Sequence, residues 1–141
     1  MIKGILIFSI IYFTAVYGKN DCVKKRDLVI HVPTKQTEET ILECRGTTYF
    51  KQYGYVYWII GDNMLVNQAD KNHYSENLQI PTKKTDCYNL PEAYLTLKNI
   101  TEEMKHTKIS CVLVDLKTPL KETIILQNIW DCFNTSSYSL P

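Results

Sequence analysis

The chain has 141 residues, with 16 basic and 15 acidic side chains and a formal net charge of +1. This length suits a single domain, and the balanced charge offers no basic field for nucleic acid or an anionic membrane. The five cysteines form no CxxC pair and the three histidines lie in separate segments, so we expect no metal site and no cofactor.

Residues 1–18 predict a secretory signal peptide. A short basic start is followed by an uncharged apolar stretch from Gly4 to Gly18, and Gly18 with Val16 two positions earlier makes a cleavage site. The alternative is a membrane anchor, but the stretch is shorter than the roughly 20 residues that span a bilayer. We therefore expect a secreted product with one domain over residues 19–130 and a C-terminal tail over residues 131–141.

Short segments with alternating apolar and polar side chains predict an all-β domain. The polar stretch 68–84 is expected to be a loop with at most one weak strand, the stretch 101–107 is expected to form a turn, and no long amphipathic helix is expected. In chain order, the expected strands are residues 28–32, 40–44, 53–60, a short edge strand at 63–67, 94–97, 109–114 and 122–129.

The spacing of Cys44, Trp58 and Cys111 is typical of an immunoglobulin-like β-sandwich, in which a disulfide joins the two sheets and a tryptophan packs on it. A second bond, Cys22–Cys87, would tie the N-terminal segment to the long polar loop. Cys132 then remains. It either forms an interchain disulfide in a homodimer or stays reduced or capped, since an odd cysteine in a secreted protein leaves both open.

The stretch "YGYVYW", residues 53–58, carries a tyrosine at every second position. Successive strand side chains point to opposite faces, so an inward Trp58 places the tyrosines on the solvent side. Three tyrosines bury roughly 450–750 Å², close to the 800 Å² or so that each partner of a standard interface buries. The expected binding face comprises Tyr53, Tyr55, Tyr57, Met64, Leu65, Val112 and Val114. The alternatives are ordinary half-exposed strand tyrosines or a homodimer seam.

Two N-glycosylation sequons occur, at Asn99 and at Asn134. Asn99 is expected at a corner after a strand and Asn134 in the tail, both away from the tyrosines. We expect no enzymatic activity, because no Ser/His/Asp arrangement and no glycine-rich phosphate loop is present.

Three segments, "YVYWIIGDNM" (55–64), "LTLKNITEEMKHTKISCVLVD" (95–115) and "IILQNIW" (124–130), resemble the interleukin-18-binding proteins. The short chain is most similar to the poxviral members, the yatapoxvirus version in particular. The block "HTKISCVLVD", residues 106–115, is the most specific part, and the resemblance extends over residues 44–130.

The resemblance implies a secreted decoy in which one immunoglobulin domain captures interleukin-18 and blocks its receptor-binding site. It also implies an aromatic cluster that receives a lysine of the cytokine. By position, Tyr53 and Tyr57 correspond to two of the family's aromatic residues, whereas Met64 stands where the third would be and offers no ring to a cation. The alternative function is an adhesion or receptor-fragment domain for another cell-surface protein.

Overall fold

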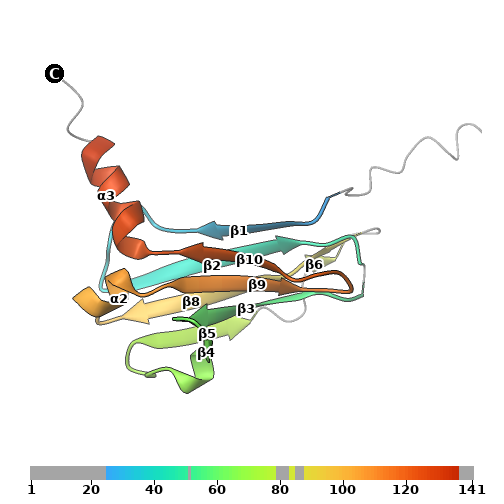
Figure 1. Cartoon of the computed structure of the whole chain (residues 1–141), viewed down its shortest axis with the longest axis horizontal. Coiled ribbons are helices and arrows are strands. Elements are labelled where there is room, and N and C mark those ends of the chain that lie inside the picture. Colours follow the sequence, from blue (N-terminus) through green and yellow to red (C-terminus); the bar gives the residue numbers. More distant parts are fainter. Residues whose placement is uncertain (1–24, 51, 79–82, 85–87, 137–141) are drawn as a thin grey trace, which may run out of the picture.

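A computed structural model describes residues 25–50, 52–78, 83–84 and 88–136 of the chain. The predicted signal peptide and the predicted bond between Cys22 and Cys87 lie outside the described residues. The described part forms two layers of antiparallel strands, with two short helices at one end (Figure 1).

Each layer is a four-stranded sheet. The first has the order β1-β2-β8-β5, and the second has the order β10-β9-β3-β4. This is the arrangement of the ABED and GFC sheets of an immunoglobulin domain, with one short additional edge strand on the second. The first sheet comprises β1 (Asp27–His31), β2 (Glu39–Thr47), β8 (Glu92–Lys98) and β5 (Tyr74–Leu78). The second comprises β10 (Leu120–Ile124), β9 (Ile109–Val114), β3 (Tyr55–Ile60) and β4 (Met64–Leu65), and a small third sheet pairs β6 (Lys83–Lys84) with β7 (Asn89–Leu90).

The core lies between the two large sheets. Cys44 on β2 and Cys111 on β9 form the predicted disulfide that joins the sheets. Trp58 on β3 is fully buried, and its Cα is paired with that of Cys111. The prediction of an all-β immunoglobulin-like sandwich with an inter-sheet disulfide is therefore confirmed.

The C-terminal part differs from the expectation. The strand expected over residues 122–129 ends at Ile124, and helix α3 (Leu126–Ser136) continues through much of the predicted tail. Leu126 is fully buried and Trp130 nearly so, and the Trp130 indole N–H donates to the Pro33 carbonyl over 3.0 Å. The apolar residues 126, 129, 130 and 133 follow a helical i, i+3, i+4, i+7 spacing, so the expectation that the strand continues to residue 129 is wrong.

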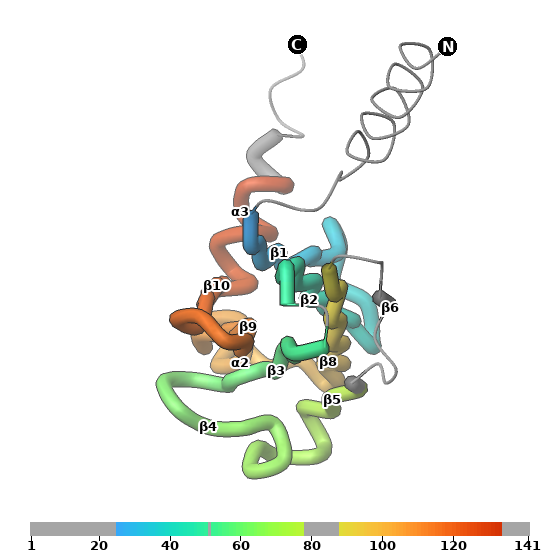
Figure 2. The backbone as a smooth tube through the Cα atoms, turned by 90° about the vertical axis from the view of Figure 1, so that its right-hand side faces the viewer, coloured from blue at the N-terminus to red at the C-terminus, as the bar shows by residue number. Residues whose placement is uncertain are grey.

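The edge strand expected at residues 63–67 is limited to Met64–Leu65, and the segment 101–107, expected to form a turn, contains a helix. After β4, the 3₁₀ helix η1 (Val66–Gln68) buries Val66 and leads to β5. Helix α2 (Glu102–His106) is capped by Thr101, whose hydroxyl accepts from the Met104 N–H at 3.2 Å, and it packs against α3. Viewed along the strands, the segment from β3 to β5 forms a broad loop below the two layers (Figure 2).

None of the helices in the described part of the chain has both the length and the apolar character that crossing a bilayer requires.

Candidate binding face

Strand β3 has the orientation that the sequence predicts. Trp58, Val56 and Ile60 are buried in the core, so the alternate residues Tyr55 and Tyr57 lie on the outer face of the second sheet. The rings of Tyr55 and Tyr57 are 6.0 Å apart between centroids and tilted by 32°. The strand thus presents neighbouring phenol rings on the side away from the core.

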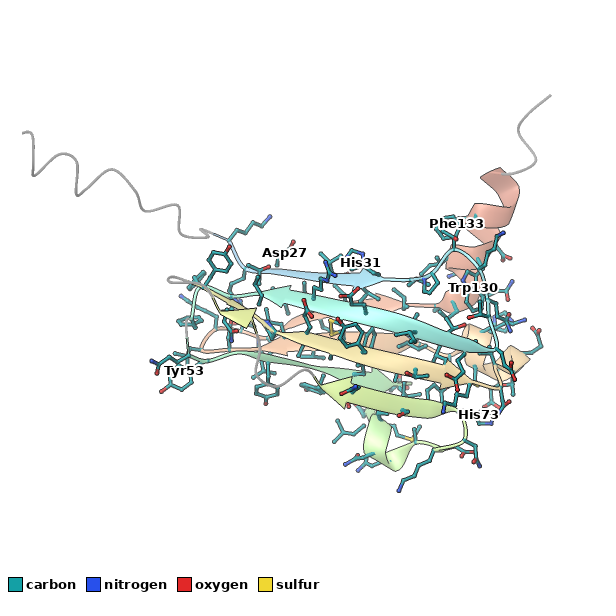
Figure 3. The ribbon with its side chains drawn as sticks, turned by 180° about the vertical axis from the view of Figure 1, so that it is seen from behind. Asp27, His31, Tyr53, His73, Trp130 and Phe133 are labelled. Carbon is teal, nitrogen blue, oxygen red and sulfur yellow. A yellow bond between two sulfur atoms is a disulfide. The ribbon has the colours of Figure 1, made fainter. Side chains whose placement is uncertain are left out.

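Tyr53 and Tyr55 are the most accessible of these rings, with 59% and 57% of their surfaces exposed, whereas Tyr57 is half-buried. Tyr53 precedes β3 and lies at the end of the sandwich far from Trp130 and Phe133 (Figure 3). For a large aromatic side chain, exposure above one half leaves much apolar area in water, which is typical of a surface that a partner covers.

Strand β9 lies beside β3 and supplies the two valines. Val114 is paired with Tyr55 and Val112 with Tyr57, and directly opposite side chains in an antiparallel pair share one face. Val114 is partly exposed, but Val112 is only 5% exposed. Val112 therefore lies on the outer face with the tyrosines as expected, but it has little exposed area, since Tyr57 on one side and Lys121 of β10 on the other flank it on the same face.

Strand β4 closes one edge of this face. Met64 and Leu65 pair with Ile60 and Ile59, and both of their side chains are exposed. Because β4 has only two residues, it leaves the first part of β3 uncovered on this edge. A cleft of about 420 Å³ opens there, lined by Tyr55, Tyr57, Leu65, Val66, Asn67 and Glu76.

Glu76, on β5 of the opposite sheet, was not among the predicted site residues. Its carboxylate accepts the Trp58 backbone N–H over 2.9 Å, so it satisfies a donor on the open edge of β3. Burial raises the pKa of Glu76, and the hydrogen bond from Trp58 opposes part of that rise. No local pattern singles out this residue, since it stands in a polar segment and reaches the cleft only through the packing of β5 near β3.

Leu65 is paired with Ile59 on the outer face, whereas Met64 is paired with Ile60, whose side chain is buried in the core, so Met64 lies at the edge and not on the tyrosine side of the sheet. We call the surface formed by Tyr53, Tyr55, Tyr57, Val114 and Leu65, with the adjoining cleft, the tyrosine face. The other predicted sites lie elsewhere. Cys132 is exposed on α3, and Asn134 lies in the last part of that helix. Asn99 is exposed in a left-handed turn with φ of 48°, after β8 of the other sheet. The interchain bond and both glycans stay predictions.

Among the described residues there is no group of three or more His, Cys, Asp or Glu side chains that could hold a metal ion. The fold and the tyrosine face together define a single immunoglobulin-like domain that presents aromatic side chains from the sheet containing β3 and β9.

Residues 27–129 match the family described as Yaba-like disease virus IL18BP, an interleukin-18-binding protein. The chain belongs to this IL18BP-like family, which is a family of binding proteins and not an enzyme class. It is also 39% identical over 112 residues to the uncharacterized protein C9 of swinepox virus (strain Kasza), a match that covers 79% of this chain and 83% of the swinepox protein.

Proposed function

We propose that this chain is a secreted viral decoy that binds interleukin-18 through the tyrosine face and keeps the cytokine from its receptor. The family supplies the partner, since its description names an interleukin-18-binding protein. The observation that carries the choice of surface is the exposed ring of Tyr55 on the sheet whose other side holds Trp58 in the core, with the exposed ring of Tyr53 directly before that strand.

The size and chemistry of the face suit a protein partner. Tyrosine combines rigid apolar area with a polar tip and is enriched among residues that dominate binding energy. Exposed Leu65 extends the apolar area beyond the rings, and exposed Met64 lies at the adjoining edge. Buried near the centre of an interface, such a set would supply most of the free energy of binding.

The cleft beside the rings suits a basic side chain of the cytokine. Met64 offers no ring face, so a cation–π contact has to come from the tyrosines. Glu76 adds a carboxylate to the cleft wall next to Tyr57. A lysine placed there would therefore meet an aromatic surface and a negative charge together.

Under this proposal, the domain inhibits the cytokine by occupying the surface that the receptor would bind. The domain makes and breaks no covalent bond in the cytokine. It competes with the receptor for one surface of the cytokine, so a slow dissociation rate matters more than a fast association rate.

The test measures binding of purified chain to immobilised interleukin-18. We expect Tyr57→Ala and Tyr53→Ala each to weaken binding by about 30-fold or more, as loss of about 2 kcal/mol at a central anchor does, mainly through faster dissociation. The matched control is Ile41→Ala, which truncates an exposed apolar side chain on the outer face of the first sheet and should leave binding unchanged.

Three results would contradict the proposal. The wild-type chain could fail to bind interleukin-18, the two tyrosine variants could bind as tightly as Ile41→Ala, or the wild-type chain could bind the cytokine without displacing it from the receptor. If the tyrosine variants instead changed only self-association, the face would be a homodimer seam.

A further inference from the structure

The residue that ends the block "HTKISCVLVD" has a buried carboxylate. The Asp115 side chain has no exposed surface, and Arg26 holds it with two parallel hydrogen bonds, from Nε at 2.7 Å and from Nη2 at 2.8 Å. The Thr48 hydroxyl donates to the same carboxylate at 2.7 Å, and the Lys117 backbone N–H donates at 2.8 Å. All four contacts are charge-assisted, the strongest kind of protein hydrogen bond.

Thr48 connects this carboxylate to the start of β3. The backbones of Thr48 and Asn89 exchange hydrogen bonds of 3.1 Å and 2.9 Å, and the Asn89 side-chain amide donates to the Gly54 carbonyl at 3.2 Å. Gly54 directly precedes Tyr55 and has a φ of +146°, and a Cβ at this position would lie 2.7 Å from the Thr48 side chain. The path of the chain between Tyr53 and Tyr55 is therefore fixed against Thr48.

These contacts join four segments that are distant in the sequence. Arg26 precedes β1, Thr48 follows β2, Asn89 belongs to β7 and Asp115 follows β9. Arg26 also donates to the Thr118 carbonyl at 2.7 Å, so the turn between β9 and β10 is held as well. In Figure 1 this turn and the start of β3 lie at the same end of the sandwich, opposite α2 and α3.

Tyr55 is held on both sides by this set of contacts. Its preceding residue, Gly54, accepts from Asn89, and its cross-strand partner, Val114, is followed by Asp115. The rings of Tyr53 and Tyr55 are each more than half exposed, so the backbone contacts contribute to fixing their position. A buried polar network whose members are all satisfied holds one arrangement of the surrounding chain.

We propose that Asp115 is a positioning residue of the tyrosine face, which orders Tyr53 and Tyr55 before the partner arrives. The inference rests on the proposed function for the identity of that partner. Asp115 does not touch the cytokine, because its carboxylate is enclosed by Arg26, Thr48 and the turn that follows β9. Ordering the contact residues in the unbound protein lowers the entropic cost of association.

The test compares Asp115→Asn and Thr48→Val with the wild-type chain. Asn keeps the shape of the side chain but loses the charge, and Val keeps the shape of Thr48 but loses the hydroxyl donor. If the ordered conformation falls to about a tenth of the population, the association rate constant for interleukin-18 falls about tenfold. The dissociation rate constant stays unchanged, because the bound state restores the ordered arrangement. This pattern is the opposite of the faster dissociation expected for Tyr57→Ala.

Two controls separate positioning from other effects. Glu103→Gln removes the same charge from exposed α2 at the far end of the sandwich, so it reports any change in long-range electrostatic steering. Ile109→Val removes a buried methylene at the far end of β9 and lowers stability without touching the network. All variants are measured well below their melting temperatures, and both controls should associate at the wild-type rate.

Amide hydrogen exchange of the unbound chain tests the inference in the absence of the cytokine. In Asp115→Asn we expect faster exchange at residues 48–50, 52–55 and 115–119 and unchanged exchange in α2 and α3. Wild-type exchange at residues 48–50 and 52–55 in Asp115→Asn, or an association rate equal to that of Ile109→Val, would overturn the inference while leaving the proposed function intact. If the wild-type chain does not bind interleukin-18, the proposed function fails and the exchange result alone decides whether Asp115 orders the tyrosines.

Discussion

Two carboxylates near the tyrosine face, those of Glu76 and Asp115, have pKa values that are shifted in opposite directions. Burial raises the pKa of Glu76, and only the Trp58 N–H opposes it. Burial would also raise the pKa of Asp115, but hydrogen bonds from Thr48, the Lys117 backbone and Arg26 outweigh it and hold that pKa below its ordinary value. Ionised Glu76 therefore opposes folding, whereas ionised Asp115 stabilises the fold.

Replacement of Glu76 by Gln should raise the melting temperature at pH 7. Gln keeps a carbonyl oxygen for the Trp58 N–H but has no charge to bury. A carboxylate whose folded pKa is raised stabilises the fold only when protonated, and this stability is lost as pH rises through the folded pKa. The advantage of the variant should therefore shrink as pH falls and vanish below the ordinary pKa of 4.5.

Calorimetric melts of both proteins between pH 3 and pH 8 would measure this difference. The effect of Asp115→Asn is the reverse. This variant should be less stable than the wild type at neutral pH, and the difference in stability should decrease only as the pH falls below 3.8, the ordinary pKa of an aspartate. A Glu76→Gln variant that is less stable than wild type at pH 7 would contradict the assignment of burial as the dominant cause.

Among the elements, helix α3 closes one end of the sandwich. Its buried side chains, Leu126 and Trp130, enter the same core as the strands, and it packs against α2. Because the indole of Trp130 donates to the Pro33 carbonyl in the segment between β1 and β2, α3 also ties down that connection.

Trp130→Phe should cost about 1 kcal/mol, since it removes the hydrogen bond but keeps an aromatic ring, and Trp130→Ala should cost about 3–5 kcal/mol. For a domain of this size, 1 kcal/mol lowers the melting temperature by about 4 °C. Phe133→Ala is the matched control, because that ring is the more exposed of the two on the same helix, and it should cost clearly less than Trp130→Ala. Equal melting temperatures for Trp130→Ala and Phe133→Ala would show that α3 does not belong to the cooperative fold.

At the scale of the whole molecule, α3 and Tyr53 lie at opposite ends (Figure 3). A link between two chains through exposed Cys132 on α3 would therefore leave both tyrosine faces open to a partner. Such a dimer could engage two cytokine molecules, and on a surface dense in cytokine the second contact would be intramolecular.

We predict that the wild-type chain migrates at twice its reduced mass on a non-reducing gel, and that Cys132→Ser migrates as a monomer. The single-site affinity for soluble interleukin-18 should be the same for both, because the substitution is remote from the tyrosine face. A wild-type chain that runs as a monomer without reductant, or a Cys132→Ser variant that still runs as a dimer, would exclude this linkage.

Much of the fold could be predicted from local signals. The period-two pattern around Trp58 determines which side of β3 is buried, because strand side chains alternate regardless of what packs on them. The spacing of Cys44 and Cys111 predicted the inter-sheet disulfide for a similar reason, because each cysteine lies on a strand that the alternating pattern predicts. The helix over residues 126–136 was missed because a few apolar residues can fit either period over so short a segment.

The sequence by itself determined the sandwich, its disulfide and the outward orientation of the tyrosines. Only the tertiary structure decided that Val112 is covered, that Glu76 enters the cleft from the other sheet, and that Asp115 meets Arg26 and Thr48. The physical reason is that no spacing or periodic pattern marks these contacts. Asp115 lies 67 residues from Thr48, the same separation as between Cys44 and Cys111, but only the cysteines belong to a recognisable pattern with Trp58. The contacts of Asp115 depend on how complete sheets pack together and leave no periodic signal in the residues that make them.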